Sequence, residues 1–104
     1  MTYRVRLRPS ALADLLALHD HIAESSGLGV AGAYVQRISS VCSSLVTFPK
    51  RGIKRDDIRA GLRIMGFERR ASIAFVIDGS DVVIVRIFYG GRNLEEHLHF
   101  LTEV

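Results

Sequence analysis

The spacing of apolar residues changes once along this chain, from three- and four-residue steps in the first half to alternation in the second. Steps of three and four place side chains on one face of a helix, whereas alternation is typical of a strand with one buried face. The change falls in segment 50–61, which is polar, basic and interrupted by Gly52. The helices are therefore expected before this segment and most strands after it.

A short strand is expected ahead of the helices. Residues 3–8 alternate apolar side chains with arginines, so one face of the strand is apolar and the other is basic. A charged face suits the edge of a sheet, where it discourages pairing with other chains. Pro9 ends this strand and, with Ser10 as a cap, is expected to begin the first helix.

Two helices are expected to form an antiparallel hairpin, because only a short link at Gly27 separates them. The first has an apolar stripe that consists of Leu12, Leu15, Leu16, His19, Ile22 and Ala23. The stripe of the second consists of Ala31, Tyr34, Val35, Ile38, Cys42 and Leu45, and Phe48 with Pro49 closes that helix.

Three strands are expected over 62–67, 71–77 and 82–89, and the Asp-Gly-Ser-Asp run 78–81 predicts a hairpin between the last two. The run 82–89 is almost wholly apolar and β-branched, which favours a strand near the middle of the sheet. Beyond it, residues 93–101 are expected to form a short helix or an ordered tail. The predicted architecture is α+β with the order β-α-α-β-β-β, a helical hairpin packed on a mostly antiparallel sheet.

The length of 104 residues, 48% of them apolar, predicts a single domain over residues 1–104. The lone Cys42 cannot form a disulfide within the chain, and it fits a reducing compartment. Nothing in the sequence resembles a signal peptide or the roughly 20 apolar residues of a membrane helix. We therefore expect a cytoplasmic protein that does not contact membranes.

Positive charge is concentrated in one stretch of the chain. The net charge is +3, yet residues 50–70 alone contain eight basic and three acidic residues, an excess of five. Such a patch favours an acidic partner, either a nucleic-acid backbone or an acidic protein segment. The alternative is a solvated surface on which Asp56 and Asp57 pair with neighbouring arginines.

Catalytic and metal-binding patterns are weak. The histidine pairs 19/21 and 97/99 have two-residue spacing, which does not converge on a metal, so no metal or cofactor is expected. Acid and base chemistry on RNA would have to draw on Arg63, Arg69, Arg86, Tyr89, Arg92 and His97. Arginine is a poor base, and no histidine is clearly placed on the sheet, so binding is favoured over catalysis.

Four stretches of the sequence together resemble the ParE branch of the ParE/RelE toxin superfamily. They are Pro-Ser-Ala-Leu-Ala-Asp-Leu at 9–15, Pro-Lys-Arg-Gly at 49–52, Arg-Asp-Asp-Ile-Arg-Ala-Gly-Leu-Arg at 55–63 and Arg-Ile-Phe-Tyr-Gly-Gly-Arg-Asn-Leu-Glu at 86–95. Each motif is loose, but their order and spacing extend the resemblance over nearly the whole chain. It implies a RelE/ParE-like fold.

The resemblance also implies an intracellular toxin that a cognate antitoxin holds inactive. ParE-type toxins inhibit DNA gyrase and leave DNA cleaved, whereas RelE-type relatives cut messenger RNA on the ribosome. Arg63 matches an arginine of the ribonuclease branch, and Tyr89 or Arg92 stands near its terminal position. The lysines and terminal histidine of the more active ribonucleases are not evident, which favours gyrase.

The leading hypothesis is therefore a toxin that presents a basic surface to gyrase or to its DNA, with gyrase as the partner and an indirect contact to DNA. A ParD-like antitoxin is expected to neutralise it in a hetero-oligomer, and a ribosome-dependent endoribonuclease is the alternative. The residues expected to bind the target or the antitoxin are Lys50, Arg51, Lys54, Arg55, Arg59, Arg63, Tyr89 and Arg92.

Overall fold

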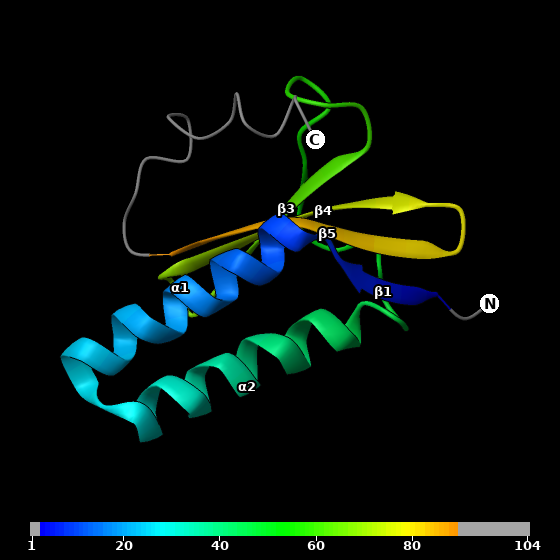
Figure 1. Cartoon of the computed structure of the whole chain (residues 1–104). Coiled ribbons are helices and arrows are strands. Elements are labelled where there is room, and N and C mark those ends of the chain that lie inside the picture. The colour runs from blue at the N-terminus through cyan, green and yellow to red at the C-terminus, as the bar shows by residue number, and fades with distance from the viewer. Residues whose placement is uncertain (1–2, 90–104) are drawn as a thin grey trace.

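The structure, a computed structural model, describes residues 3–89 and places a helical hairpin against one face of a five-stranded sheet (Figure 1). The elements are β1 (Arg4–Leu7), α1 (Pro9–Ser26), α2 (Leu28–Ser44), β2 (Ile53–Lys54), β3 (Leu62–Phe67), β4 (Ala71–Asp78) and β5 (Asp81–Tyr89). The predicted α+β class and the helical hairpin are confirmed. The expected tail, with Arg92, lies outside the described residues.

The sheet has the order β1-β5-β4-β3-β2. Only β1 and β5 are parallel, and the other three pairings are antiparallel, so the sheet is mostly antiparallel as expected. β1 lies at an edge and β5 lies inside the sheet, which confirms both predicted positions. The expected order lacked β2, whose two residues pair with Arg63 and Ile64 of β3.

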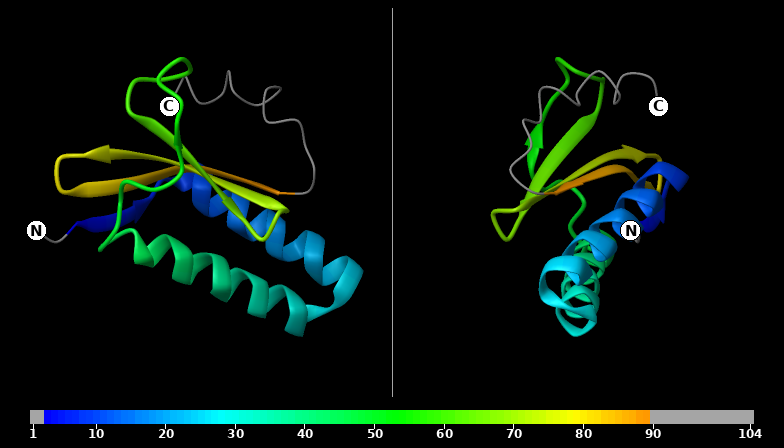
Figure 2. Two further views of the ribbon diagram at one scale, coloured as in Figure 1. Left: turned by 180° about the vertical axis from the view of Figure 1, so that it is seen from behind. Right: turned by 60° about the vertical axis from the view of Figure 1, so that its left-hand side comes forward.

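Glycines at the turns take backbone conformations that other residues rarely adopt. Gly27, with φ of 95°, ends α1 and directly precedes α2, so the hairpin turns at the expected residue. Gly79, with φ of 60°, lies in the β4–β5 turn, where Asp78 pairs with Asp81. The two helices lie together on one side of the sheet in both views of Figure 2.

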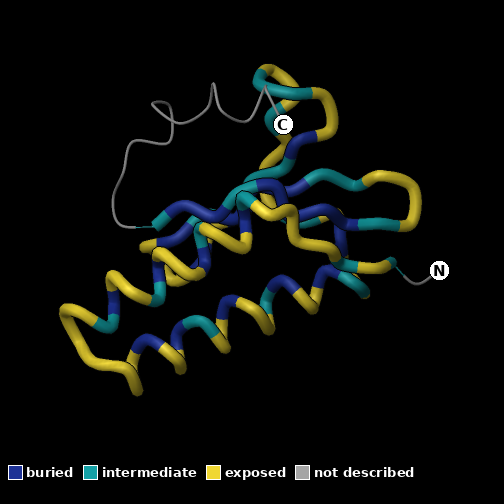
Figure 3. Tube along the Cα trace, viewed as in Figure 1, coloured by how far each residue is buried: buried dark blue, intermediate teal, exposed yellow. Residues whose placement is uncertain are grey.

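The main core lies between the hairpin and the sheet, and burial alternates along each helix (Figure 3). The stripe expected for the second helix is confirmed, with Ile38 of α2 and Leu45, directly after the end of α2, both fully buried. In α1 it was partly wrong, because Leu12 and Leu16 are 52% and 62% exposed. The residues that α1 buries are Ala11, Leu15, Leu18 and Ile22.

A smaller apolar cluster lies on the helix-free face of the sheet, which is the face opposite the hairpin. Its buried members are Leu62, Ala74, Val85 and Phe88. Ile58, from the turn that precedes β3, packs against this cluster. The sheet is therefore covered on both faces near β4 and β5, as the apolar run 82–89 indicated.

Side chains of α1 complete the hydrogen bonding of β5 where β1 stops. β1 ends at Leu7, opposite Ile84, whereas β5 continues to Tyr89. Ser10 Oγ donates to the Val85 carbonyl at 3.0 Å, so this serine is not the helix cap that was expected. Asp14 Oδ2 accepts the Ile87 N–H at 2.8 Å. Buried backbone groups need such partners, so Ser10 and Asp14 fix how α1 is placed on the sheet.

Asp14 also forms the least exposed ion pair in the described part of the chain. Its carboxylate accepts the Arg86 Nε at 2.7 Å and Nη2 at 2.9 Å, and the two side chains are only 15% and 25% exposed. The hydrogen bond to Asp14 raises the pKa of Arg86 above its ordinary value. Arg86 also lies over the Phe88 ring, so it joins α1 to the helix-free face of the sheet.

Candidate binding surface

Three residues of the expected basic surface gather beside the end of α2. Lys54 pairs with Arg63 across β2 and β3, which places both side chains on the same face of the sheet as the hairpin. Arg51 Nη1 donates to Ser44 Oγ at 2.6 Å, and Arg63 Nη1 donates to the Arg51 carbonyl at 3.5 Å. The structure therefore brings Arg51, Lys54 and Arg63 together, and we call these three the basic surface below.

Gly52 holds the backbone of this surface close to β3. Its φ is 79°, and a Cβ atom at this position would lie 2.5 Å from the Ile64 carbonyl oxygen. Real Cβ atoms do not approach a backbone atom so closely, and non-glycine residues rarely adopt this φ. Glycine is therefore required here for the segment to approach the sheet and form β2.

Carboxylates in the turn before β3 have structural roles. Asp57 accepts two hydrogen bonds from Arg55, both at 3.0 Å, and this pairing lowers the pKa of Asp57. Asp56 accepts the Gly61 N–H at 2.8 Å and lies 3.7 Å from Lys54 Nζ. The interpretation of these aspartates as salt-bridge partners is confirmed.

Arg59 lies apart from the basic surface. It follows the turn around to the helix-free face, where it lines a cavity with Arg6 and Arg8 of the β1 region. The expected site is thus divided between the two faces of the sheet. Lys50 and Arg51 line a second hollow, together with the exposed Phe48 and with Tyr3.

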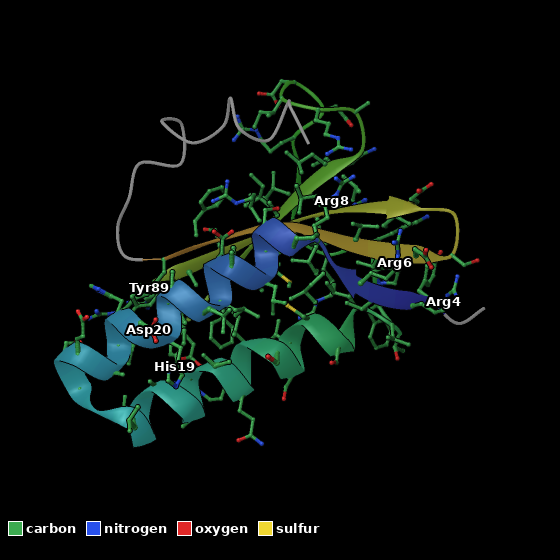
Figure 4. The ribbon with its side chains drawn as sticks, in the orientation of Figure 1. Arg4, Arg6, Arg8, His19, Asp20 and Tyr89 are labelled. Atoms are coloured by element: carbon green, nitrogen blue, oxygen red, sulfur yellow. The ribbon has the colours of Figure 1, made fainter. Side chains whose placement is uncertain are left out.

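Tyr89 lies at the other end of the sheet, in an aromatic cluster under the helices. Its ring meets the edges of His21 and Tyr34 at centroid distances of 5.7 and 5.6 Å, and Tyr34 meets Phe67 at 5.5 Å. Figure 4 shows Tyr89 beside α1 and far from the arginines of β1. The contact between His21 and Tyr89 could not be expected from the sequence, because it depends on how α1 is rotated against the sheet.

Charged residues beside this cluster pair with one another. Burial is the main cause that raises the pKa of Tyr34, and the nearby Tyr89 is the second. The Tyr34 hydroxyl is buried and has no hydrogen-bond partner among residues 3–89. Arg37 lies over the Tyr34 ring and forms two hydrogen bonds with Glu68, at 2.9 and 3.1 Å. This pairing lowers the pKa of Glu68. The arginine nearest the Tyr34 ring is therefore already paired.

Arg63 and Tyr89 do not converge. Strand register aligns Tyr89 with Phe67 through Ala71, so four residues of β3 separate Tyr89 from the level of Arg63. Four residues correspond to about 13 Å along a strand, and two strand spacings of about 5 Å each separate the residues in the perpendicular direction, across the sheet. A ribonuclease site that joins these two side chains is therefore not formed by the described residues.

Metal-binding side chains do not cluster in the described residues. Residues 3–89 contain no group of three or more His, Cys, Asp or Glu side chains able to hold a metal ion. Cys42 is buried, which raises the pKa of its thiol to about 11. His19 Nδ1 lies 3.6 Å from Asp20, and both side chains point away from the sheet in Figure 4. Within 3–89, no helix is long and apolar enough to span a membrane.

The sequence is similar to those of known proteins. Residues 5–94 match the family described as ParE toxin of type II toxin–antitoxin system, parDE. Toxin ParE3 of Caulobacter vibrioides is 37% identical over 94 residues, which is 90% of this chain and 92% of that protein.

Two solved structures resemble the fold. The chromosomal ParDE system from P. aeruginosa superposes with a TM-score of 0.75 and 28% identity, over 86% of this chain and 97% of that one. The RelBE2 toxin–antitoxin complex of Mycobacterium tuberculosis, at 21% identity, superposes with a TM-score of 0.55 over 86% and 99% of the two chains. This chain belongs to the ParE toxin family of type II toxin–antitoxin systems.

Proposed function

We propose that this ParE-type toxin inhibits DNA gyrase by binding it and stabilising its cleaved complex with DNA. The separation of Arg63 from Tyr89 is the observation that carries this choice, because it leaves arginines without a proton-transfer group beside them. Arg51, Lys54 and Arg63 then serve as a docking surface, a role for which charge and exposure suffice. The toxin is proposed to act in the cytoplasm and not as an enzyme.

A cognate ParD-type antitoxin is proposed to neutralise the toxin by forming a hetero-oligomer with it. The similarity to a ParDE system supports this partner. Leu12 and Leu16 form an exposed apolar strip on α1. The basic surface lies beside the end of α2. An acidic segment that folds on binding would complement both features.

A supercoiling and cleavage assay with purified gyrase tests the proposal. We expect the toxin to block supercoiling and to accumulate cleaved DNA, and we expect the Arg51→Ala/Lys54→Ala/Arg63→Ala variant to lose this effect. Arg70→Ala, which removes an exposed arginine from the β3–β4 turn, is the matched control. Unaffected supercoiling at doses that stop growth would refute gyrase as the target.

The second candidate is a ribosome-dependent endoribonuclease, and the contact of His21 with Tyr89 is the observation that favours it. A histidine is the natural base for such a reaction at neutral pH. Mapping transcript ends after induced expression separates the two functions, because only a ribonuclease produces cuts within translated codons. Cuts that disappear in His21→Gln or Tyr89→Phe would establish the enzyme.

A further inference from the structure

The helix-free face of the sheet contains a cavity of about 440 Å³ that is lined by three arginines. Its floor is apolar, because Val76 and Val83 point to this face. Arg6 and Arg8 come from the β1 region on one side, and Arg59 comes from the turn before β3 on the other. The cavity therefore lies away from the basic surface and away from Tyr89.

The arginines of this cavity are incompletely neutralised. Asp81 pairs with Arg4 at 3.1 Å and with Arg6 at 3.0 Å, so one carboxylate serves two guanidinium groups. Asp78 is the only carboxylate among the described residues that line the cavity.

Arg8 and Arg59 make no ion pair within residues 3–89, and Arg59 Nη1 is buried there without a hydrogen-bond partner. A buried guanidinium donor without a partner is costly, and rotation of the Arg59 guanidinium toward an anion in the cavity would offset that cost.

The arginines also form a regular row. Arg4, Arg6 and Arg8 follow one another at two-residue intervals along β1 and on to the start of α1 (Figure 4). Alternate residues of a strand point to the same face and lie roughly 7 Å apart. Evenly spaced cations fit a polymer with regularly repeated negative charges better than they fit a single carboxylate.

We propose that this face binds the phosphodiester backbone of a nucleic-acid strand, with one phosphate held by Arg8 and Arg59 in the cavity. The planar guanidinium presents paired donors that match phosphate oxygens. Arg6 and Arg4 then contact the strand farther along β1. The toxin itself thus touches nucleic acid directly. This inference holds whether or not gyrase is the target.

Direct binding of labelled oligonucleotides to the purified full chain tests the inference by fluorescence anisotropy, with single-stranded DNA and RNA of one sequence as separate arms. We expect binding to both, weakened about tenfold for each arginine removed in Arg8→Ala and Arg59→Met. The plot of log affinity against log salt should become shallower by about 0.7 for each lost contact. Arg70→Ala is the matched control and should bind nearly as the wild type does.

Thermal unfolding separates loss of binding from loss of folding. Arg59→Met keeps the apolar stem and removes a donor that lacks a partner, so its melting temperature should equal or exceed that of the wild type. Weaker binding together with undiminished stability marks a residue kept for its ligand and not for the fold.

Three outcomes would overturn the inference. The wild type could fail to bind either oligonucleotide at low salt, or Arg70→Ala could weaken binding as much as the cavity variants do. In the third outcome, poly-glutamate binding depends on Arg8 and Arg59 but oligonucleotide binding does not. That result would assign the cavity to an acidic protein.

Discussion

Removing the carboxylate of Asp14 should destabilise the fold more than removing any other charge in the described part of the chain. Asp14→Ala eliminates three hydrogen bonds at once, two from Arg86 and one from the Ile87 N–H. It leaves a guanidinium that is 25% exposed without its partner, and it leaves a strand N–H without an acceptor.

The cost can be estimated from these contacts. Breaking a fully buried ion pair costs about 3–5 kcal/mol, and solvent at Arg86 reduces this to roughly 2 kcal/mol. The lost acceptor for Ile87 adds about 1 kcal/mol. We therefore expect Asp14→Ala to lower the free energy of unfolding by about 3 kcal/mol, and Asp14→Asn, which keeps one acceptor oxygen, by about half as much. A chain of this size should lose roughly 4–8 °C of melting temperature per kcal/mol.

Urea unfolding followed by circular dichroism measures these effects, and the second variant Arg86→Met completes a double-mutant cycle. The double variant contains neither charged group, so no charge is left without its partner. Its loss in free energy of unfolding should therefore be about 2 kcal/mol smaller than the sum of the losses in the two single variants. Additivity within about 0.5 kcal/mol would refute the reasoning, because it would show that Asp14 and Arg86 do not interact.

Three further predictions concern the backbone, the core and the thiol. Gly52→Ala should lower the free energy of unfolding, measured with urea, by about 2 kcal/mol or more. Gly61 has a similar φ but open space around it, so Gly61→Ala should cost only about 1 kcal/mol. Equal losses would show that the close approach of Gly52 to Ile64 is unimportant. Leu15→Ala should cost about 3 kcal/mol, and Leu16→Ala less than about 0.5 kcal/mol, because only Leu15 is buried; the reverse order would restore the stripe expected from the sequence. Burial raises the pKa of Cys42 from 9.0 to about 11, so the thiol of the unfolded chain ionises at lower pH than that of the folded chain. The free energy of unfolding should therefore fall as the pH rises between these values, by at most about 3 kcal/mol relative to Cys42→Ala. Parallel pH profiles of stability for the two proteins would contradict this.

The sequence predicted the elements well because the periodicity is strong, but it could not orient α1. Leucines occupy positions 12, 15, 16 and 18, so several faces of this helix could have been the buried one. The rotation is decided by Ser10 and Asp14, which must reach the unpaired edge of β5. The backbone groups of β5 that need these hydrogen-bond partners lie more than 70 residues away in the sequence. A local pattern of apolar residues carries no information about them.

Part of the site could have been predicted and part could not. The hairpin at 78–81 sets the register of β5 on β4 up to the one-residue shift between Ala74 and Phe75, so counting gives the distance of Tyr89 from the other end of the sheet to within one residue. The pairing of Lys54 with Arg63 depends on a strand of two residues, which is too short to show a period. The position of Arg59 depends on the path of a turn around the sheet, and no local signal places it beside Arg8.

The position of β5 has a consequence for how the chain is made. Among the strands of residues 3–89, β5 is synthesised last, yet β1 pairs with it, as Arg4 does with Asp81, and β4 pairs with it on the other side. Until β5 emerges, the first strand has no partner in the sheet, and α1 can pack against α2 but not against β5. Closing such long loops is slow, and the incomplete chain exposes apolar surface meanwhile. A protein that captures the nascent chain therefore meets it before the toxin exists as a folded body.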